Sequence, residues 1–425
     1  TSRGVLLVGS LQAREAEAEF RRALDLTADA HVRADLVAWI VPSMLERNAY
    51  AESLALISEA RSWLGSNDTF LAAQLAAAEA WAFYDLSRID EAALAGESAL
   101  RMLAAFGQAS WQRLQATRVM AHGAMASVSR ARLDVAAALR HAQAAVDAAD
   151  RGGLRRLAVS KLGFLGGLRF DQGALTEADR IRSATARAAE ELGDSYTVAY
   201  LTMYLSDHDR IWLSIDRGLA RLDVAERLMA HIEDRHGQAD QQARRAVFRL
   251  WRGDVQAALG LLEGPAVGAS DDVSSRSHGY NLNRLAQARL VADPSAWARA
   301  KDALDQALAL PGTRNDHLLR FNLATTAAAL WITAGEAGRA VTCLERESPR
   351  AGFPLWGRLE RSLIESIATS ASGDRATAAR QLIGLQAVTG DYPLYATRIA
   401  RLLAEPDHHP LRIPRLLWCG SDASA

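Results

Sequence analysis

Five aromatic or imidazole side chains follow one another at intervals of four residues near the middle of this chain. They are Tyr196, Tyr200, Tyr204, His208 and Trp212. On an α-helix, four residues complete one turn plus about 40°, so these rings form one continuous stripe. Such rings can stack on a flat ligand or a peptide, and their polar ends can hydrogen bond to it. Aromatic stripes more often fill the core between helices, and solvent exposure of Tyr200 and Tyr204 distinguishes the two interpretations.

Other polar groups extend this hypothesis. Arg118 and His122 fall in an earlier helix, and we expect them near Tyr200, Tyr204 and His208 across the superhelix. The predicted ligand- or peptide-binding residues are therefore Tyr196, Tyr200, Tyr204, His208, Arg118 and His122. A weaker group for contacts with a peptide backbone is Asn281, Asn283 and Arg284, which are alternatively capping residues.

Catalytic patterns are sparse. The run Asp207-His208-Asp209 is either an acid/base set or a charge cluster on a helix surface. The run Asp407-His408-His409 resembles a metal site but falls in a proline-containing tail, where solvated side chains are the more common case. The sequence has neither a His-Glu-x-x-His motif nor a nucleophilic serine elbow. We therefore predict that the chain is not an enzyme and carries no metal or cofactor.

Small residues recur at intervals of about forty residues along the whole chain, as expected of helical hairpin repeats. The predicted anchor positions are Ala16, Ser53, Ala92, Ala136, Ala178, Ala225, Ala258, Ala300, Ala340 and Ala378. Twelve residues before each anchor the residue is again small, except at Val41 and Leu213. Paired small residues let two antiparallel helices approach closely, so we expect ten hairpins. The hairpin containing Leu213 is the irregular one, and irregularity in a repeat is typical of a functional site.

The predicted fold class is all-α, a superhelical tetratricopeptide-like solenoid of antiparallel helix hairpins. We expect repeats one to seven in residues 1–264, a hinge loop in 265–277, repeats eight to ten in 278–404 and a proline-containing tail in 405–425. The tail is expected to be extended and docked through Trp418. If Gly4 is the small packing residue of the first helix, about half of that helix lies before residue 1. We therefore expect the chain to be part of a longer polypeptide.

Composition limits the classes of partner and the cell compartment that we expect. The formal net charge is -1, which does not favour binding to a nucleic-acid backbone. Only two cysteines are present, as is common in a reducing cytoplasm, and no apolar run is long enough for a membrane span. We therefore expect a cytoplasmic protein that binds neither nucleic acid nor membrane.

Helix ends such as Ala189-Glu-Glu-Leu-Gly193-Asp194, together with the anchors about forty residues apart, resemble the tetratricopeptide-like arrays of large bacterial LuxR-type and related STAND transcription regulators. This resemblance implies a sensor arm that binds an inducer or a protein. The chain departs from a complete regulator because neither Lys161 nor Lys301 follows a glycine, so the phosphate-loop motif of the ATPase is missing. No DNA-binding helix pair is evident after residue 404.

The sequence thus favours a non-catalytic module whose concave face binds a peptide, a protein or a small-molecule inducer, with domains of the same polypeptide as further partners. The alternatives are a stand-alone scaffold for protein–protein interaction and, third, an enzyme that uses a helical cavity.

Overall fold

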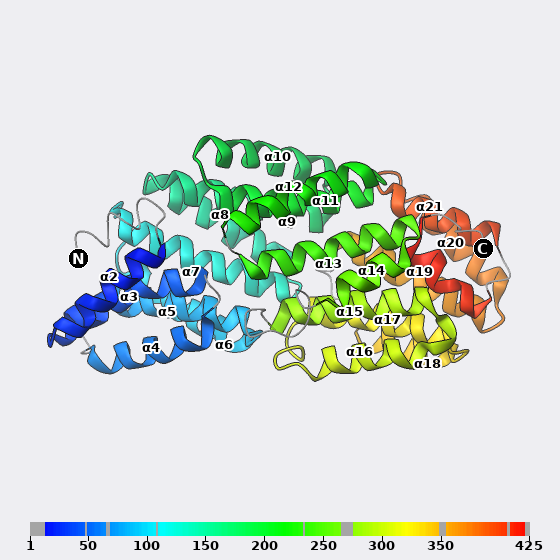
Figure 1. Cartoon of the computed structure of the whole chain (residues 1–425), viewed down its shortest axis with the longest axis horizontal. Helices are drawn as coiled ribbons and strands as arrows, with labels where there is room; N and C mark the ends of the chain where they lie inside the picture. The colour runs from blue at the N-terminus through cyan, green and yellow to red at the C-terminus, as the bar shows by residue number, and fades with distance from the viewer. Residues whose placement is uncertain are drawn as a thin grey trace. The chain divides into compact units, whose positions relative to one another are not determined.

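The computed structural model describes residues 13–46, 49–64, 69–107, 109–232, 234–264, 275–347, 354–405 and 409–420. All regular secondary structure in these ranges is helical (Figure 1). The helices alternate as the first and second members of antiparallel hairpins. The all-α, tetratricopeptide-like solenoid predicted from the repeats is confirmed.

Nine complete hairpins lie in the described residues. Their first helices are α3 (Ala30–Glu46), α5 (Thr69–Asp85), α7 (Gln112–Ala131), α9 (Arg155–Gln172), α11 (Ser195–Ile211), α13 (Arg235–Arg252), α15 (Ser275–Ala292), α17 (His317–Thr333) and α19 (Leu355–Ala371). Their second helices are α4 (Tyr50–Trp63), α6 (Ile89–Ala104), α8 (Val135–Arg151), α10 (Leu175–Glu191), α12 (Ile215–His231), α14 (Val255–Leu262), α16 (Trp297–Ala309), α18 (Ala337–Arg346) and α20 (Arg375–Gln386). The 3-10 helix η1 (Pro294–Ala296) precedes α16.

Helix α2 (Ala13–Leu26) precedes α3 and corresponds in its anchor position to the second helices of the hairpins. Gly4, the predicted packing residue before it, lies outside the described residues. After the last hairpin come α21 (Pro393–Ala404), η2 (Pro410–Arg412) and α22 (Ile413–Trp418).

A short turn joins the hairpin of α9 and α10 to the hairpin that begins with α11. At the end of α10, Gly193 takes a φ of 66°, a left-handed conformation that glycine adopts without steric cost. The following Asp194 accepts a hydrogen bond from the backbone N–H of Thr197 at 3.0 Å and so caps α11. This stop and cap use two adjacent residues, which explains why the helix-end pattern in the sequence is so short.

The small anchor residues share one position, the fourth residue of α2 and of the second helix in each hairpin. All ten residues at this position are buried. They are Ala16, Ser53, Ala92, Ala138, Ala178, Gly218, Ala258, Ala300, Ala340 and Ala378. Eight of these match the sequence prediction. The other two predicted anchors were wrong, because Ala136 is exposed and Ala225 lies two turns beyond the equivalent position of α12.

Gly218 explains the error at the hairpin of α11 and α12, which is the sixth of the ten hairpins expected from the sequence. A Cβ atom on Gly218 would lie 2.3 Å from Cε1 of Phe248, so only glycine fits where the other hairpins use alanine or serine. Twelve residues earlier lies Ser206, which is small and fully buried, whereas Leu213 lies in the turn after α11 with a φ of 57°. The sixth hairpin is therefore regular, and its supposed irregularity gives no reason to place a function there.

The chain divides into two compact units. The first comprises residues 1–130 and 136–162, and the second comprises residues 131–135 and 163–425. Residues 265–274 of the expected hinge lie outside the described residues, and 275–277 belong to α15. The other domain boundaries expected from the sequence stay a prediction.

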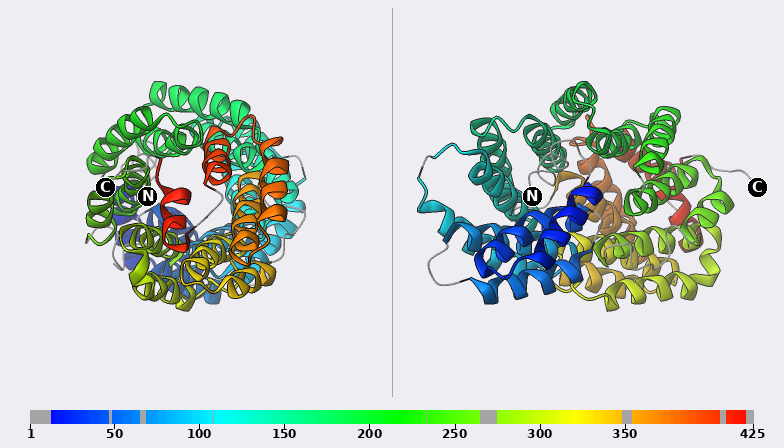
Figure 2. Two further views of the ribbon diagram at one scale, coloured as in Figure 1. Left: turned by 90° about the vertical axis from the view of Figure 1, so that its right-hand side faces the viewer. Right: turned by 60° about the vertical axis from the view of Figure 1, so that its left-hand side comes forward.

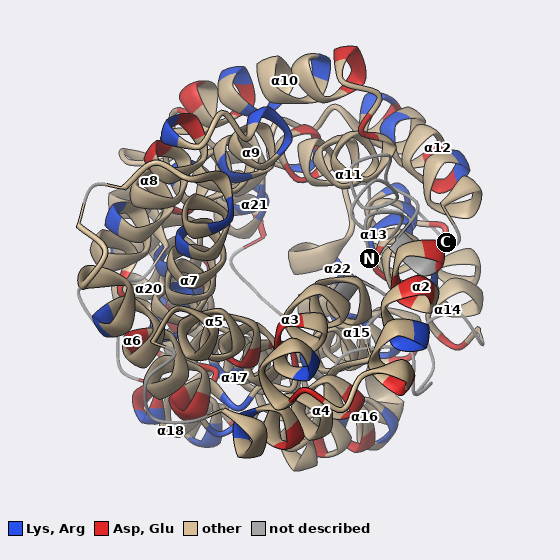
Figure 3. Ribbon diagram, turned by 90° about the vertical axis from the view of Figure 1, so that its left-hand side faces the viewer, with Lys and Arg blue, Asp and Glu red and all other residues tan. Residues whose placement is uncertain are grey.

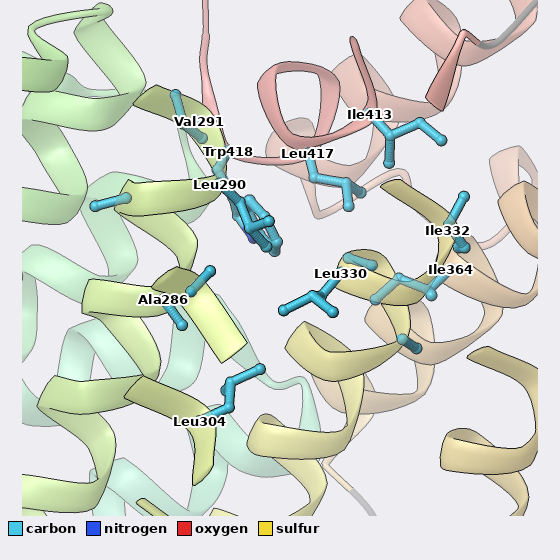
Figure 4. Packing of buried hydrophobic residues seen from close by; sticks show 14 of the residues in the cluster. Ala286, Leu290, Val291, Leu304, Leu330, Ile332, Ile364, Ile413, Leu417 and Trp418 are labelled. Atoms are coloured by element: carbon cyan, nitrogen blue, oxygen red, sulfur yellow. The ribbon is translucent and has the colours of Figure 1, made fainter. Parts of the chain in front are cut away.

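The largest apolar core of the second unit includes the C-terminal segment. In Figure 2, α22 lies against the first helices of this unit, and the same cluster of buried side chains contains residues of α13, α15, α17 and α22. Trp418 lies beside Leu290, with Leu417 and Ile413 directed toward Leu330 and Ile332 (Figure 4). Docking through Trp418 is confirmed, but the tail is helical over residues 410–418 instead of extended.

Both cysteines are free thiols. None of the described helices is long and apolar enough to cross a membrane.

Candidate functional site

The aromatic stripe runs from the surface into the core of the second unit. Tyr196 at the start of α11 is 48% exposed, and its ring centroid lies 4.7 Å from that of Tyr200. Tyr200 and Tyr204 are half-buried, with ring centroids 6.0 Å apart. Both pack on the cluster formed with α12 and α13, yet each keeps part of its surface accessible. The first three rings can therefore contact a ligand.

His208 occupies the buried end of the stripe and has no exposed surface. Its Nε2 lies 3.0 Å from Nη1 of Arg182 on α10, and its ring packs on Phe170 with centroids 4.7 Å apart. Burial, followed by the positive charge of Arg182, lowers the pKa of His208 to about 3. The imidazole is therefore neutral and accepts a hydrogen bond from the guanidinium. In this conformation, His208 positions the helix behind the site and does not face a ligand.

The neighbours of His208 point in different directions. Asp207 forms an ion pair with Arg244 of α13, while Asp209 is fully buried and pairs with Arg217 and Arg221 of α12. The three side chains thus contact three different helices, and they form neither an acid/base set nor a surface cluster. Trp212, the last ring of the stripe, lines a hollow of about 360 Å³ beside the turn that contains Gly173.

The exposed part of the stripe continues onto the next two first helices at equivalent positions. Helices α11, α13 and α15 begin at Ser195, Arg235 and Ser275, so residues forty apart correspond. In Figure 3 these helices lie side by side on the inner side of the second unit. We name as the inner-face strip the nine residues at the second, sixth and tenth positions, namely Tyr196, Tyr200, Tyr204, His236, Asp240, Arg244, Arg276, Tyr280 and Arg284.

Ion pairs connect this strip from helix to helix. Arg244 lies over the ring of Tyr204, 5.0 Å from its centroid, and contacts Asp207 on one side and Asp240 on the other. Nη1 of Arg284 is 3.1 Å from Oδ1 of Asp240. The side chains of Arg244, Asp240 and Arg284 are 13%, 18% and 17% exposed. They are thus held in place and still reach solvent.

The charged side chains of the strip form ion pairs, and these pairs keep the carboxylates ionised. Burial alone would raise the pKa of Asp240, but the charges of Arg244 and Arg284 outweigh it and hold this pKa well below its usual value. Burial would raise the pKa of Asp207 as well, but the charges of Arg244, Arg210 and Arg182 together outweigh it and lower this pKa. Arg276 pairs with the fully buried Asp316 at 2.6 Å. The strip therefore presents ordered donors and rings, with its positive charges already paired.

In the described part of the C-terminal segment, α22 packs away from this strip. Helix α22 packs on the C-terminal halves of α13, α15 and α17, against residues such as Leu250, Leu290 and Leu330. The strip occupies the N-terminal halves of α11, α13 and α15. The inner side of the second unit thus has one part filled by the chain's own tail and one part with polar and aromatic side chains that reach solvent.

Two of the predicted site residues lie in the first unit. Arg118 is 9% exposed, and its guanidinium donates to the carbonyl of Gly107 and, at 3.4 Å, to that of Leu103 at the end of α6. Nδ1 of His122 lies 3.1 Å from Nδ1 of His141 on α8. Their expected position near the tyrosines of the second unit stays a prediction.

The asparagines expected to contact a peptide lie just behind the strip. Asn281 and Asn283 are 2% and 5% exposed, inside α15 and not at its cap. Oδ1 of Asn281 accepts a hydrogen bond from Arg284 at 3.0 Å. In this conformation both support the strip instead of forming its surface. Of the predicted metal group, Asp407 and His408 lie outside the described residues.

Sequence reasoning missed His236, Asp240, Arg244, Arg276 and Tyr280. The available signal was their forty-residue spacing from the tyrosines, which becomes visible only once Gly218 replaces Ala225 as the anchor.

Comparisons with known proteins support the fold alone. No protein-family model matches the chain, and no curated protein matches its sequence. The chain is similar in structure to a Rap protein complexed with competence and sporulation factor, with a TM-score of 0.54 and 11% identity over 88% of this chain and 99% of that one. A tetratricopeptide repeat protein from Parabacteroides merdae matches with a TM-score of 0.37 and 12% identity over 68% of this chain and 98% of that one. The likeness to the Rap protein, over 88% of this chain, supports the helical-repeat fold described above.

Proposed function

We propose that this chain is a peptide- or protein-binding repeat module and that the inner-face strip is its binding surface. The observation that carries the proposal is the recurrence of solvent-reaching aromatic and charged side chains at three equivalent positions on three consecutive first helices. Packing needs only small or apolar residues there. Ion pairs between the helices hold these side chains in place, which lowers the entropy lost when a partner binds.

The dimensions of the strip suit a short extended segment. Neighbouring packed helices lie about 8–10 Å apart, so α11 to α15 span about 16–20 Å. A strand rises about 3.3 Å per residue, so about five or six residues cross the strip. Tyrosine rings can take their apolar side chains, while the guanidinium of Arg284 and the phenol groups can bind backbone carbonyls.

We propose binding and not catalysis, because Asp240, the one acidic residue of the strip, is paired with two arginines. The lowered pKa of Asp240, which Arg244 and Arg284 maintain against the effect of burial, keeps this carboxylate ionised. That is the opposite of what a general acid near neutral pH requires. The similar Rap protein was itself solved with a bound factor, which favours a signalling factor as the class of partner.

A peptide-display selection against the whole chain tests the binding surface. Tyr196→Ala removes a ring that is 48% exposed, and should leave the fold intact while weakening selected peptides about tenfold, as loss of an aromatic hot spot does. The matched control is Ile383→Ala, which removes a 58% exposed side chain from α20 and should leave affinity unchanged. Selected peptides that bind the Tyr196 variant and the wild type equally would contradict the proposal.

We further propose that the module is the sensing arm of a bacterial transcription regulator, on the strength of the LuxR-type and STAND resemblance of its repeats. The reading frame on either side of this segment tests that idea. An upstream phosphate-loop domain or a downstream DNA-binding domain supports it. A frame that codes for neither favours the stand-alone scaffold instead.

A further inference from the structure

Lys161 of α9, in the first unit, is a cation with no carboxylate partner among the described residues. It is one of only two lysines in the chain and is half-buried. The other, Lys301, forms an ion pair with Asp305 at 2.5 Å on the surface of α16. Among the described residues, no carboxylate lies within ion-pairing distance of Lys161, and Nζ of Lys161 donates no hydrogen bond. All three N–H groups of its ammonium are therefore available.

An indole ring and a glycine surround this ammonium. Nζ of Lys161 lies 5.1 Å from the ring centroid of Trp81 on α5. The indole N–H of Trp81 donates to the carbonyl of Met120 on α7 at 2.9 Å, which fixes the ring. A Cβ on Gly123 would lie 3.1 Å from Cζ2 of Trp81 and 3.4 Å from Nζ of Lys161. Glycine at this position therefore makes room for the ring and the ammonium to meet.

In the part of the chain that the structure describes, no anion balances the charge of Lys161. The ring face of Trp81 attracts the ammonium by a cation–π interaction, but it satisfies none of the N–H donors. Burial lowers the pKa of Lys161 to about 8, and no neighbouring charge counteracts the effect. A partly desolvated charge without a counter-ion is unfavourable, so a bound anion would relieve a cost that the free protein carries.

We propose that Lys161 and Trp81 form a binding site for a small organic carboxylate whose apolar part is planar. The carboxylate oxygens accept hydrogen bonds from Nζ of Lys161. The apolar part packs on the indole ring of Trp81 beside Met120. This site belongs to the first unit, and its existence does not depend on the peptide-binding function proposed for the second.

The pair of lysines allows a direct test by NMR. Lysine labelled with ¹³C at the ε carbon, supplied during expression of the whole chain, reports on Lys161 and Lys301 without altering their ammonium groups, and each signal is titrated with pH. Benzoate is the probe, and benzamide is the matched neutral control. Because benzoate stabilises the charged amine, we expect it to shift the Lys161 signal to saturation and to raise its pKa by about one unit, which corresponds to tenfold tighter binding to the charged form. Lys301, whose side chain is 39% exposed, is the internal control and should not respond.

Two variants complete the test. Trp81→Leu should weaken benzoate binding about tenfold while Lys161 remains. Lys161→Met should abolish binding and raise the melting temperature of the free chain, because it removes an unpaired charge. An equal shift of both lysines indicates an effect of ionic strength, and an equal effect of benzamide indicates an apolar hollow. Either result, or no shift at all, overturns the proposal.

Discussion

The role of Gly218 in the sixth hairpin predicts an unusual response to Gly→Ala substitution. Gly218 lies in α12, and a Cβ there would be 2.3 Å from Cε1 and 2.4 Å from Cζ of Phe248 on α13. Carbon atoms in contact normally lie about 3.5–4.0 Å apart. The ring of Phe248 is only 1% exposed, so it cannot move away into solvent. Gly218→Ala should therefore overpack the contact between α12 and α13.

The expected magnitude follows from two opposing effects. Overpacking a buried contact costs about 1–3 kcal/mol, whereas replacing glycine by alanine within a helix gains about 0.8–1.0 kcal/mol. The matched control is Gly384→Ala in α20, where a Cβ meets no atom within 4 Å. That variant should show the helix gain alone. Gly218→Ala should therefore be about 1–3 kcal/mol less stable than Gly384→Ala.

Urea denaturation followed by circular dichroism measures both variants, and amide hydrogen exchange localises the effect to α12 and α13. In the background of Phe248→Leu, the smaller side chain leaves room for the new methyl group, so Gly218→Ala should lose most of its penalty. Equal stabilisation by Gly218→Ala and Gly384→Ala would refute the assignment of Gly218 as an anchor, and with it the corrected repeat register.

Three further predictions follow from the packing and the charges. Ala300→Phe, at a fully buried anchor, should lower the free energy of unfolding by about 1–3 kcal/mol; an unchanged urea midpoint would contradict this. Arg398→Ala removes the charged partner of Glu360, whose Oε2 lies 2.8 Å from Nη1 of Arg398. It leaves this half-buried carboxylate with Tyr395 as a remaining hydrogen-bond partner and should cost about 1.5–3 kcal/mol, the contribution of a hydrogen bond to a charged group; Ile383→Ala serves as the surface control. Burial and Arg182 lower the pKa of His208 to about 3, below the value of about 6.5 in the unfolded chain. As pH falls, the unfolded chain therefore binds the proton first. The contribution of neutral His208 to the free energy of unfolding is complete above about pH 6.5 and is lost toward pH 3, by up to about 1.4 kcal/mol per pH unit. In urea titrations at several pH values, the free energy of unfolding of His208→Gln should depend less steeply on pH over this range.

The sequence determined the fold class because helical repeats are built from local signals. A small residue at the fourth position of each second helix, a short turn and an apolar face recur every forty residues or so, and eight of ten anchors were placed correctly from them. The two errors share a cause. In an alanine-rich chain several small residues occur within one helix, so spacing alone did not select Ala138 over Ala136 or Gly218 over Ala225.

The sequence also predicted the stripe from Tyr196 to Trp212, but not which of its rings reach solvent. Identical four-residue steps gave an exposed Tyr196 and a fully buried His208, because exposure depends on the helix packed opposite each residue. Arg182 and Phe170 cover His208 from α10 and α9, and no pattern within α11 contains that information.

Tertiary structure alone decided which charges meet. Arg244 joins Asp207 to Asp240, and Arg284 joins Asp240 to α15, through residues that lie about forty positions apart in the sequence. Trp81, Gly123 and Lys161 meet from three different helices. Helical periodicity fixes the face on which each side chain lies, but the distance between faces of separate helices is set by their packing, and the chemistry of both candidate sites depends on that distance.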